Sequence, residues 1–346
     1  MKVAVILFNL GGPDSKQSIE PFLMNFFTDK NIVRLPNPMR WFIARMIAYS
    51  RSRKEAAESY HELGDQSPLL ANSTEQVRAL EENLNAAQDG KDYKVFICMR
   101  YWHPMAPEVA RNVKDWEPDH IVLLPLYPQF STTTTRSSYQ QWEAACDDID
   151  LLAPVSTICC YPRDNGFIAA SADNVRQTYD RAFSEFGQAP RVLFSAHGVP
   201  EDFITDGDPY QWQVEQSAAD IAAATGIHNL DWQVCYQSRV GRKKWIGPSI
   251  DESLHKAAAE KIPVIVLPHA FTQEHVETLV EIEIEYRLVA DKLGIPGYMR
   301  VPVVGTHPAF IDGLGEIVRR EGYRTWLAPD TGKRICPQEF CRCLMQ

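Results

Sequence analysis

The sequence has neither a long hydrophobic run nor an excess of positive charge. None of its apolar stretches approaches the about 20 consecutive apolar residues that a membrane-spanning helix requires, so the chain is not expected to cross a bilayer. The formal net charge is -10, with 45 acidic against 35 basic residues. A molecule with this charge repels nucleic acid and anionic lipid as a whole, and a nucleic-acid partner is therefore not expected.

The sequence also lacks a secretory signal and a dinucleotide-binding fingerprint. Residues 1–9 carry one lysine and no small-residue cleavage site, which makes the cytoplasm the expected compartment. No Gly-x-Gly-x-x-Gly follows the first apolar run. The chain has 8 cysteines. In the cytoplasm thiols stay reduced, so these cysteines indicate metal binding rather than a disulfide framework.

The remaining composition is that of an ordinary folded protein. Hydrophobic residues make up 45% and charged residues 23% of the 346 positions, a length that suffices for two domains. Short β-branched or apolar runs predict buried strands at residues 3–8, 95–99, 121–124, 192–194 and 264–267. Helical spacing between them, as at 75–87 and 277–293, predicts β-α-β units and an α/β fold with parallel sheets.

Two predicted strands end in similar turns. The first is Asn-Leu-Gly-Gly-Pro at residues 9–13, and the second is Ser-Ala-His-Gly-Val-Pro at residues 195–200. This repetition indicates two similar halves. Ligands of open parallel sheets bind at the carboxyl ends of the strands, so both turns are expected at functional edges.

Residues 21–47 are rich in large apolar side chains with basic residues among them. One interpretation is a pair of helices that pack into the core. The other is an exposed apolar lip, because large exposed apolar patches mark binding surfaces.

His197 is a candidate functional residue because it directly follows a strand and precedes a glycine. The alternative is a structural histidine whose ring is bound by the backbone. Glu277, Glu281 and Glu285 recur at every fourth position beside His275 and would form one carboxylate row on a helix. A solvated acidic face is the alternative there.

An imidazole and clustered carboxylates together suit a divalent first-row metal that must be passed on, since thiolates would hold it more tightly. Such groups also accept protons near neutral pH. The C-terminal Cys336, Cys341 and Cys343 indicate zinc or an iron-sulfur cluster, with three incidental cysteines as the alternative. A [2Fe-2S] cluster needs a fourth thiolate, for which Cys159 and Cys160 are the candidates.

Taken in order, these segments resemble the ferrochelatase family across nearly the whole chain. The matching stretches are residues 8–13, 100–104, 127–131, 194–200, 237–241, 245–248 and 271–285. The resemblance implies a chelatase-like α/β fold of two similar Rossmann-like domains, with parallel sheets that face each other across a cleft. It implies an N-terminal domain at 1–160 with the lip at about 21–47, a second domain at 161–325 with His197 and Glu277, and a cluster tail at 326–346.

The activity implied is that of a lyase, a metal chelatase that inserts Fe2+ into protoporphyrin IX to form protohaem in the last step of haem biosynthesis. The residue Asn9 and those that follow it resemble members that use protoporphyrin. By position in the family, His197 and Glu277 are the catalytic residues that bind iron or accept protons, and His275, Glu281 and Glu285 line a proton or metal path. The implied porphyrin contacts are Leu10, Tyr60, Ser67, Arg100, Tyr101, Trp245 and Phe271.

The tail resembles the family branch that carries a [2Fe-2S] cofactor. This places the cluster on Cys336, Cys341, Cys343 and one of Cys159 and Cys160, since residues 127–134, where animal members have a cysteine, contain none. The lip corresponds to an apolar surface that rests on a membrane, which implies a cytoplasmic protein peripheral to the inner face of the membrane. Two alternatives stay open: a chelatase for another tetrapyrrole or metal, and a haem- or cluster-binding protein without turnover.

Overall fold

The computed structural model describes residues 1–53, 55–239, 243–321 and 334–345, which divide into two compact units. Unit 1 comprises Met1–Cys159 and resumes at Leu314. Unit 2 comprises Cys160–Gly313 together with the described residues of the tail. Residues 326–333 of the predicted tail, and Val240 and Gly241 of one family motif, lie outside the described residues.

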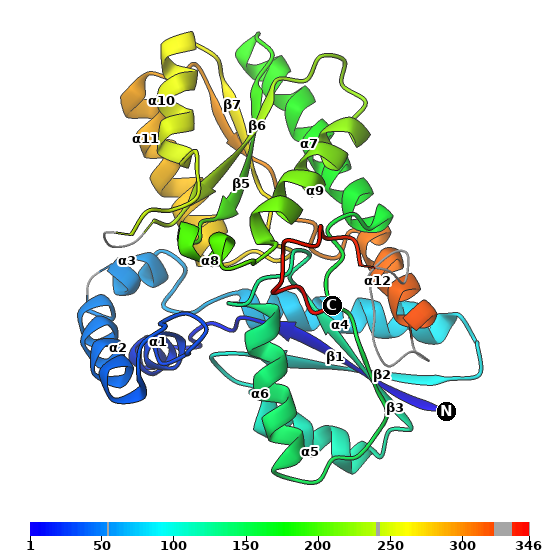
Figure 1. Ribbon diagram of the computed structural model, residues 1–346. Helices are drawn as coiled ribbons and strands as arrows, with labels where there is room; N and C mark the ends of the chain where they lie inside the picture. The colour runs from blue at the N-terminus through cyan, green and yellow to red at the C-terminus, as the bar shows by residue number, and fades with distance from the viewer. Residues whose placement is uncertain (54, 240–242, 322–333, 346) are drawn as a thin grey trace. The chain divides into compact units, whose positions relative to one another are not determined.

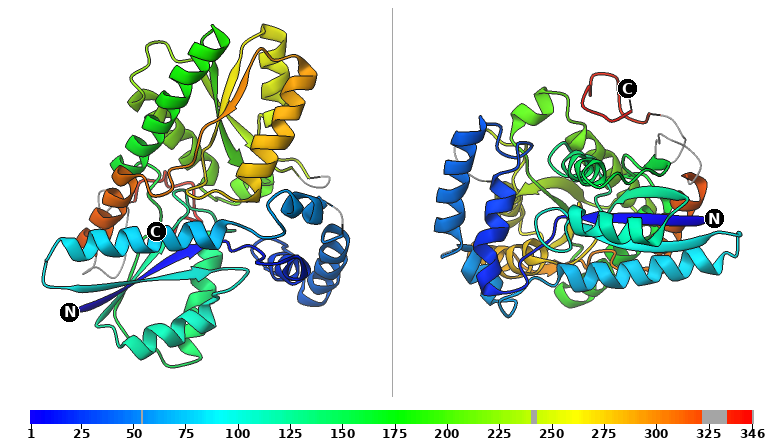
Figure 2. Two further views of the ribbon diagram at one scale, coloured as in Figure 1. Left: turned by 180° about the vertical axis from the view of Figure 1, so that it is seen from behind. Right: turned by 90° about the horizontal axis from the view of Figure 1, so that it is seen from below.

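Unit 1 is built on a four-stranded parallel sheet with the order β2-β1-β3-β4. The strands are β1 (Lys2–Asn9), β2 (Asp92–Met99), β3 (His120–Pro125) and β4 (Val155–Thr157). The central strands β1 and β3 are buried along almost their whole length, which is why they read as continuous apolar runs. Helix α4 (Leu69–Ala86) covers one face, and α5 (Ala106–Trp116) and α6 (Thr135–Asp147) cover the other (Figures 1 and 2).

The lip of unit 1 follows β1 and consists of α1 (Ile19–Phe27), after a short 3-10 turn, and α2 (Asn37–Arg51), with α3 (Glu55–His61) behind them. Helix α1 buries Ile19, Phe22 and Leu23. Helix α2 buries only Ala44 and Ala48. Its large apolar side chains are exposed, namely Met39, Trp41, Phe42 and Met46. Of the two interpretations of residues 21–47, the helix that packs into the core therefore applies to α1, and the exposed apolar lip applies to α2.

Unit 2 repeats the architecture with a second parallel sheet of order β6-β5-β7-β8. Its strands are β5 (Arg191–His197), β6 (Trp232–Gln237), β7 (Val264–Pro268) and β8 (Tyr298–Arg300). Helices α7 (Asn165–Phe186) and α9 (Tyr210–Ala224) cover one face, and α10 (Ile250–Glu260) and α11 (Tyr286–Leu293) cover the other (Figure 2). The order matches that of unit 1 strand for strand, so the predicted α/β class with two similar parallel sheets is confirmed.

Side chains fix the starts of two of these helices. Asp164 accepts hydrogen bonds from the backbone nitrogens of Gly166 and Phe167 at the start of α7. Ser249 and Glu252 form a capping box at the start of α10. Two further helices are α8 (Glu201–Thr205) and α12 (Pro308–Glu321). No helix within the described ranges combines the length and the apolar character needed to span a membrane.

The predicted helix at 277–293 forms in two parts of different type. Its first nine residues are a π-helix, η2 (Glu277–Glu285), and only Tyr286–Leu293 is α-helical. The sequence predicted a continuous helix of the ordinary kind, and this detail was wrong. A π-helix bonds each N–H to the carbonyl five residues back, a rare arrangement that is frequent at functional sites.

Candidate active site

His197 and Glu277 form a hydrogen-bonded pair in unit 2. His197 is the last residue of the central strand β5, and Glu277 is the first residue of η2. The distance from His197 Nδ1 to Glu277 Oε2 is 3.1 Å. The two side chains are 39% and 26% exposed, so both can be reached by a ligand. The carboxyl end of β5 therefore presents an imidazole whose Nδ1 is already bound, with Nε2 left for a reacting partner.

The pair perturbs the acidity of both partners. Burial alone would lower the pKa of His197, but the charge of Glu277 and the hydrogen bond to it raise that pKa above its usual value. Burial would likewise raise the pKa of Glu277, and the facing imidazole lowers it instead. The hydroxyl of Tyr210 donates to the backbone oxygen of His197 at 3.0 Å and holds the end of the strand in place. The geometry suits an imidazole that accepts a proton and is stabilised as a cation.

Glu281 lies one step further along η2 and is bound by the end of strand β6. Gln237 Nε2 donates to Glu281 Oε2 at 3.0 Å, and Ser238 Oγ donates to the same oxygen at 2.7 Å. The amide of Gln237 is oriented by Ser195, whose hydroxyl donates to Gln237 Oε1 at 2.8 Å. Burial and the charge of Glu277 raise the pKa of Glu281 to about 7. Glu281 can therefore exchange protons near neutral pH.

The remaining unit 2 residues predicted from the sequence lie near the same strand ends or along η2. The backbone N–H of Glu277 donates to His275 Nδ1 at 3.0 Å, which leaves the ring proton of a neutral His275 on Nε2. Burial lowers the pKa of His275. The ring of Phe271 lies 4.7 Å from the ring of His275, centroid to centroid. Glu285 is exposed at the far end of η2.

Trp245 approaches the turn after His197. The residue pairs with Pro200 in an isolated bridge, and a Cβ atom added to Gly198 would lie 3.2 Å from Trp245 Cε3. The same Cβ would lie 3.0 Å from the backbone oxygen of Gln237, so a side chain at position 198 would press on both groups, which explains the glycine beside His197. Gln237 and Ser238, by contrast, lie in a stretch that resembles the family but have no site role in the sequence-based prediction, because the polar edge strand β6, which ends at Gln237, was not recognised.

In unit 1, three of the predicted porphyrin contacts meet at the ends of β1 and β2. The backbone nitrogen of Tyr101 donates to the oxygen of Leu10 at 2.9 Å, and that of Arg100 donates to the oxygen of Asn9 at 2.8 Å. Ser67 donates through its backbone nitrogen to Pro13 at 2.8 Å, in the same glycine-rich turn. Tyr60 is buried in the last turn of α3.

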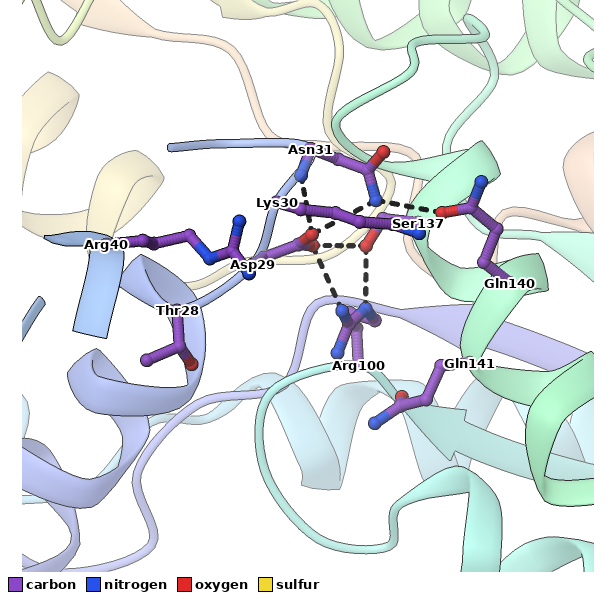
Figure 3. A pocket seen from close by; sticks show the side chains of 9 residues that line it. All are labelled: Thr28, Asp29, Lys30, Asn31, Arg40, Arg100, Ser137, Gln140 and Gln141. Atoms are coloured by element: carbon purple, nitrogen blue, oxygen red, sulfur yellow. Dashed lines mark hydrogen bonds and ion pairs between the residues drawn. The ribbon is translucent and has the colours of Figure 1, made fainter. Parts of the chain in front are cut away.

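Arg100 is part of a polar pocket of about 290 Å³ in unit 1 (Figure 3). At its centre lies the buried Asp29, whose Oδ2 binds Arg100 Nη2 at 3.0 Å and accepts from the Tyr101 hydroxyl at 2.7 Å. Ser137 also donates to this oxygen, and Arg100 Nε donates to Ser137 Oγ at 2.7 Å. Tyr101 is fully buried, so its hydroxyl fixes the position of the Asp29 carboxylate without itself lining the pocket. The lining residues are Thr28, Asp29, Lys30, Asn31, Arg40, Arg100, Ser137, Gln140 and Gln141.

The tail cysteines pack on unit 2. Cys336 and Cys343 are buried and hydrogen-bonded to each other, and this contact together with burial raises the pKa of the Cys336 thiol. Gln213 Nε2 lies 3.0 Å from Cys336 Sγ and 3.3 Å from Cys160 Sγ. Cys341 is exposed and lies against Asp206, with its Sγ 3.5 Å from the backbone oxygen. The structure thus places Cys160 and Cys336 on the same amide nitrogen.

The described part of the chain contains no group of three or more His, Cys, Asp or Glu side chains arranged to hold a metal ion. All eight cysteines are free. The thiols near Gln213 nevertheless match the ligand chemistry of an iron-sulfur cluster, since they are sulfur donors from separate segments that share one amide donor. The residues present therefore fit such a group in donor type.

The fold has counterparts among solved structures. SirB from Bacillus subtilis with Fe3+ superposes with a TM-score of 0.51 at 14% sequence identity, over 93% of this chain and 96% of that one. The sirohydrochlorin chelatase SirB from Bacillus subtilis subspecies spizizenii in complex with cobalt gives a TM-score of 0.50 at 14% identity, over the same shares of both chains. The chain therefore has the fold of a chelatase.

Sequence comparison identifies the family within the chelatase fold. The family model described as ferrochelatase matches residues 2–322. The ferrochelatase of Caulobacter vibrioides strain NA1000 / CB15N is 48% identical over 92% of this chain and 90% of its own length. Those of Rickettsia bellii strain OSU 85-389 and Pelagibacter ubique are each 42% identical over 99% of this chain, and over 95% and 98% of their own. The chain belongs to the ferrochelatase family, and the predicted enzyme class, a metal-chelatase lyase, is confirmed.

Proposed function

We propose that this chain inserts Fe2+ into protoporphyrin IX to form protohaem, with His197 and Glu277 as the catalytic residues. The observation that carries the proposal is the hydrogen-bonded pair at the end of β5 in a chain of the ferrochelatase family. Insertion must remove two protons from the central nitrogens of the porphyrin. An imidazole whose cationic form is stabilised by a carboxylate is suited to take them.

In this mechanism the porphyrin is bound in a distorted shape, so that its nitrogen lone pairs point toward the entering metal, and binding energy from the periphery of the ring offsets the strain. His197 accepts a pyrrole proton on Nε2 while its Nδ1–H stays on Glu277. The iron keeps its oxidation state throughout. Glu281 then takes up protons because its pKa of about 7 matches the operating range, and the exposed Glu285 is the proposed exit.

The proposed porphyrin contacts are the residues that the family resemblance assigns. Trp245 and Phe271 offer aromatic surface for a flat ring, and Leu10 offers apolar surface. Arg100 is the proposed partner of a propionate, although Asp29 already binds its guanidinium. Lys30 and Arg40 line the same pocket and add positive charge, which supports a carboxylate ligand there. Tyr101 would act indirectly, by holding Asp29.

A [2Fe-2S] cluster on Cys336, Cys341, Cys343 and Cys160 is the proposed cofactor. Of the two candidates for the fourth ligand, Cys160 is favoured because it shares the Gln213 amide with Cys336. When bound, the cluster would supply a one-electron redox centre that takes no part in the steps above. Colourless wild-type protein with one zinc per chain would contradict the cluster.

The proposed location is the cytoplasm, at the inner face of the membrane. Eight free cysteines suit a reducing compartment. The exposed apolar side chains of α2 lie on a helix that also carries Arg40, Arg45 and Arg51, a combination that favours the surface of an anionic bilayer. This local surface would act against the net charge of the whole molecule.

The decisive experiment is a spectrophotometric insertion assay with Fe2+ under anaerobic conditions. Protoporphyrin IX should be converted over many turnovers, and sirohydrochlorin with cobalt should not. The reverse preference would identify a chelatase for another tetrapyrrole. Binding of haem without turnover would identify a carrier.

A further inference from the structure

Gln213 is a buried amide whose nitrogen faces two sulfur atoms. The residue lies in the first turn of α9 and is 0% exposed. Its Nε2 is 3.0 Å from Cys336 Sγ and 3.3 Å from Cys160 Sγ, short distances for contacts to sulfur. A primary amide carries two hydrogens on this nitrogen, so it can donate one to each sulfur.

The two sulfurs come from distant parts of the chain. Cys160 precedes α7, and Cys336 lies in the tail, 53 and 123 positions away from Gln213. The helix that carries Gln213 is anchored in the core, because Ser217 Oγ donates to the Gln213 backbone oxygen and contacts His269 Nε2 at 2.7 Å. The amide therefore offers a fixed donor against which both sulfurs are placed.

The tail is docked at a second point just before α9. The backbone nitrogen of Arg342 donates to the oxygen of Gly207 at 3.1 Å, and the rings of Phe340 and Trp212 lie 6.1 Å apart. Arg334 binds the backbone oxygens of Cys336, Pro337 and Phe340 and so shapes the loop from inside. Cys336 thus approaches Gln213 from a loop whose position is fixed by several other contacts with unit 2 and within the tail.

The chemistry of a neutral thiol does not account for this arrangement. A thiol sulfur is a weak acceptor, and a buried amide that donates to one gains little. A thiolate is a much better acceptor because the hydrogen bond is then charge-assisted. Two donated hydrogens in a buried site are therefore best matched by two metal-bound thiolates.

We propose that Gln213 is a positioning residue of the [2Fe-2S] centre, which donates N–H···S hydrogen bonds to the Cys160 and Cys336 thiolates and raises the reduction potential of the cluster. The inference rests on the proposed cluster. Hydrogen bonds to the ligand sulfurs stabilise the reduced, more negative cluster more than the oxidised one, which is why they raise the potential. They also hold two ligands from separate segments at one metal centre.

The test compares full-length wild type with Gln213→Leu and Gln213→Glu, purified without oxygen. The readouts are iron and sulfide per chain, the visible spectrum, Fe–S stretching frequencies and the midpoint potential from a spectroelectrochemical titration. Gln213→Leu removes both donors at similar volume. At the wild-type midpoint potential its ratio of reduced to oxidised cluster should fall about tenfold, equivalent to about 59 mV for a one-electron couple.

Gln213→Glu keeps the shape of the side chain and replaces the donor with a negative acceptor, so its midpoint should fall further than that of Gln213→Leu. Gln216→Leu, three residues further along α9, is the matched control and should keep the wild-type midpoint. If Gln213→Leu does not fold, the isosteric Gln213→Glu decides the question.

The two proposals fail in different ways. Wild-type protein without equimolar iron and sulfide would overturn the cluster, and with it the role of Gln213. Wild-type protein with a cluster, alongside variants whose midpoint and Fe–S frequencies are unchanged, would overturn the role of Gln213 alone. A folded Gln213→Leu that has lost the cluster supports the holding role.

Discussion

A histidine that donates one ring nitrogen to a carboxylate has only the other nitrogen for chemistry. In this chain the carboxylate is Glu277, and the backbone of His197 is held by the Tyr210 hydroxyl. The tautomer and the orientation of the ring are thus set before any substrate binds. The next acid along η2, Glu281, has a raised pKa instead of a lowered one, because it is buried and faces the carboxylate of Glu277. Its hydrogen-bond donors, Gln237 and Ser238, are both neutral.

Replacement of His197 by alanine should abolish iron insertion without unfolding the protein. General base catalysis contributes about 100- to 10,000-fold, so kcat should fall by at least about 100-fold in His197→Ala. Glu277→Gln should lower kcat severely as well, because a neutral amide stabilises the imidazolium far less. The insertion assay measures both, with circular dichroism as the check on folding. The exposed His255 on α10 provides the control His255→Ala, and near wild-type turnover in His197→Ala would contradict the assignment.

Glu281 should make the stability of the protein fall as the pH rises. Its pKa is about 7 in the folded chain, against the usual value of 4.5 for a glutamate, so the folded state holds the proton more tightly. The stabilisation is complete below pH 4.5 and is lost as the pH rises through about 7.

Glu281→Gln should therefore gain stability relative to wild type between pH 5 and pH 8, by about 1 to 3 kcal/mol at 1.36 kcal/mol per pKa unit. Thermal unfolding of both proteins across this range measures the difference. Glu185→Gln on the surface of α7 is the control. A Glu281→Gln curve parallel to that of wild type would contradict the prediction.

The charged residues of the site could be predicted from the sequence. The neutral residues that bind and orient them could not. His197 and Glu277 stand out by their positions after a strand and at the head of an acidic row. Gln237 and Gln213 are neutral amides inside polar segments, and nothing in local composition distinguishes them from surface glutamines. Their roles depend on contacts 40 or more positions away, such as Gln237 with Glu281 and Gln213 with Cys336.

At the scale of elements, the strands that the sequence missed lie at the edges of the sheets. The five predicted strands correspond to β1, β2, β3, β5 and β7, which include both strands at the centre of each sheet. The missed strands β4, β6 and β8 are edge strands. These three strands are covered less completely and are either short or mixed in polarity, so they lack the apolar run that identifies the central strands and, at 95–99, the edge strand β2.

Gly207, in the loop between α8 and α9, contacts the C-terminal tail closely. Its φ of 94° is left-handed, and an added Cβ would lie 2.6 Å from Cys341 Sγ and 2.9 Å from Cys341 N. Gly207→Ala should therefore displace the tail and lower the metal content per chain. Gly226→Ala is the matched control, since its φ of 68° imposes similar backbone strain but the added Cβ meets nothing within 4 Å.

Each of these two glycine variants should lose about 1 to 2 kcal/mol from the left-handed backbone. Only Gly207→Ala should also lose metal and become sensitive to proteases at the tail. Metal analysis and limited proteolysis measure this. Equal metal content in the two variants would show that the contact between Gly207 and Cys341 does not matter.

The lip should bind anionic vesicles through α2. Trp41 and Phe42 are 55% and 60% exposed. The double substitution Trp41→Ser and Phe42→Ser should lower co-sedimentation with anionic vesicles at least several-fold, because it removes the apolar surface that enters the bilayer interface. Phe183→Ser on α7, whose ring is 53% exposed, is the control. Unchanged binding in the double variant would assign the contact to another surface.

At the scale of the whole molecule, one strand order occurs twice with different outcomes. Strand β1 in unit 1 and β5 in unit 2 hold the same place in their sheets. β1 ends in Asn9, whose amide donates to Ser73 Oγ at 3.0 Å and whose Oδ1 accepts from the nitrogen of Leu10 at 2.8 Å. β5 ends in His197 with its ring on Glu277. The same position thus holds a turn in one unit and carries the proposed base in the other.

The return of the chain to unit 1 predicts a sharp contrast between two truncations. Leu314, Ile317 and Val318 on the second half of α12 are buried, and Arg319 Nη1 donates to Asn83 in unit 1 at 3.0 Å. A chain that ends at Gly313 should be insoluble because it lacks the second half of α12. A chain that ends at Glu321 should fold, although without Cys336, Cys341 and Cys343 it should lack visible absorption. Expression yield, solubility and the absorption spectrum measure the difference, and equal solubility of the two chains would contradict it.

The division at Leu314 also bears on how the protein is made. A ribosome adds about 5 to 20 residues per second, and domains tend to fold as they emerge. Unit 1 starts the chain but is completed only from Leu314 onward, so its sheet must wait for the synthesis of nearly all of unit 2. For roughly 8 to 30 s at these rates the nascent N-terminal sheet lacks its last helix. Unit 1 is therefore translated first but cannot be completed until nearly all of unit 2 has been made, and this interval is when the chain most needs a chaperone.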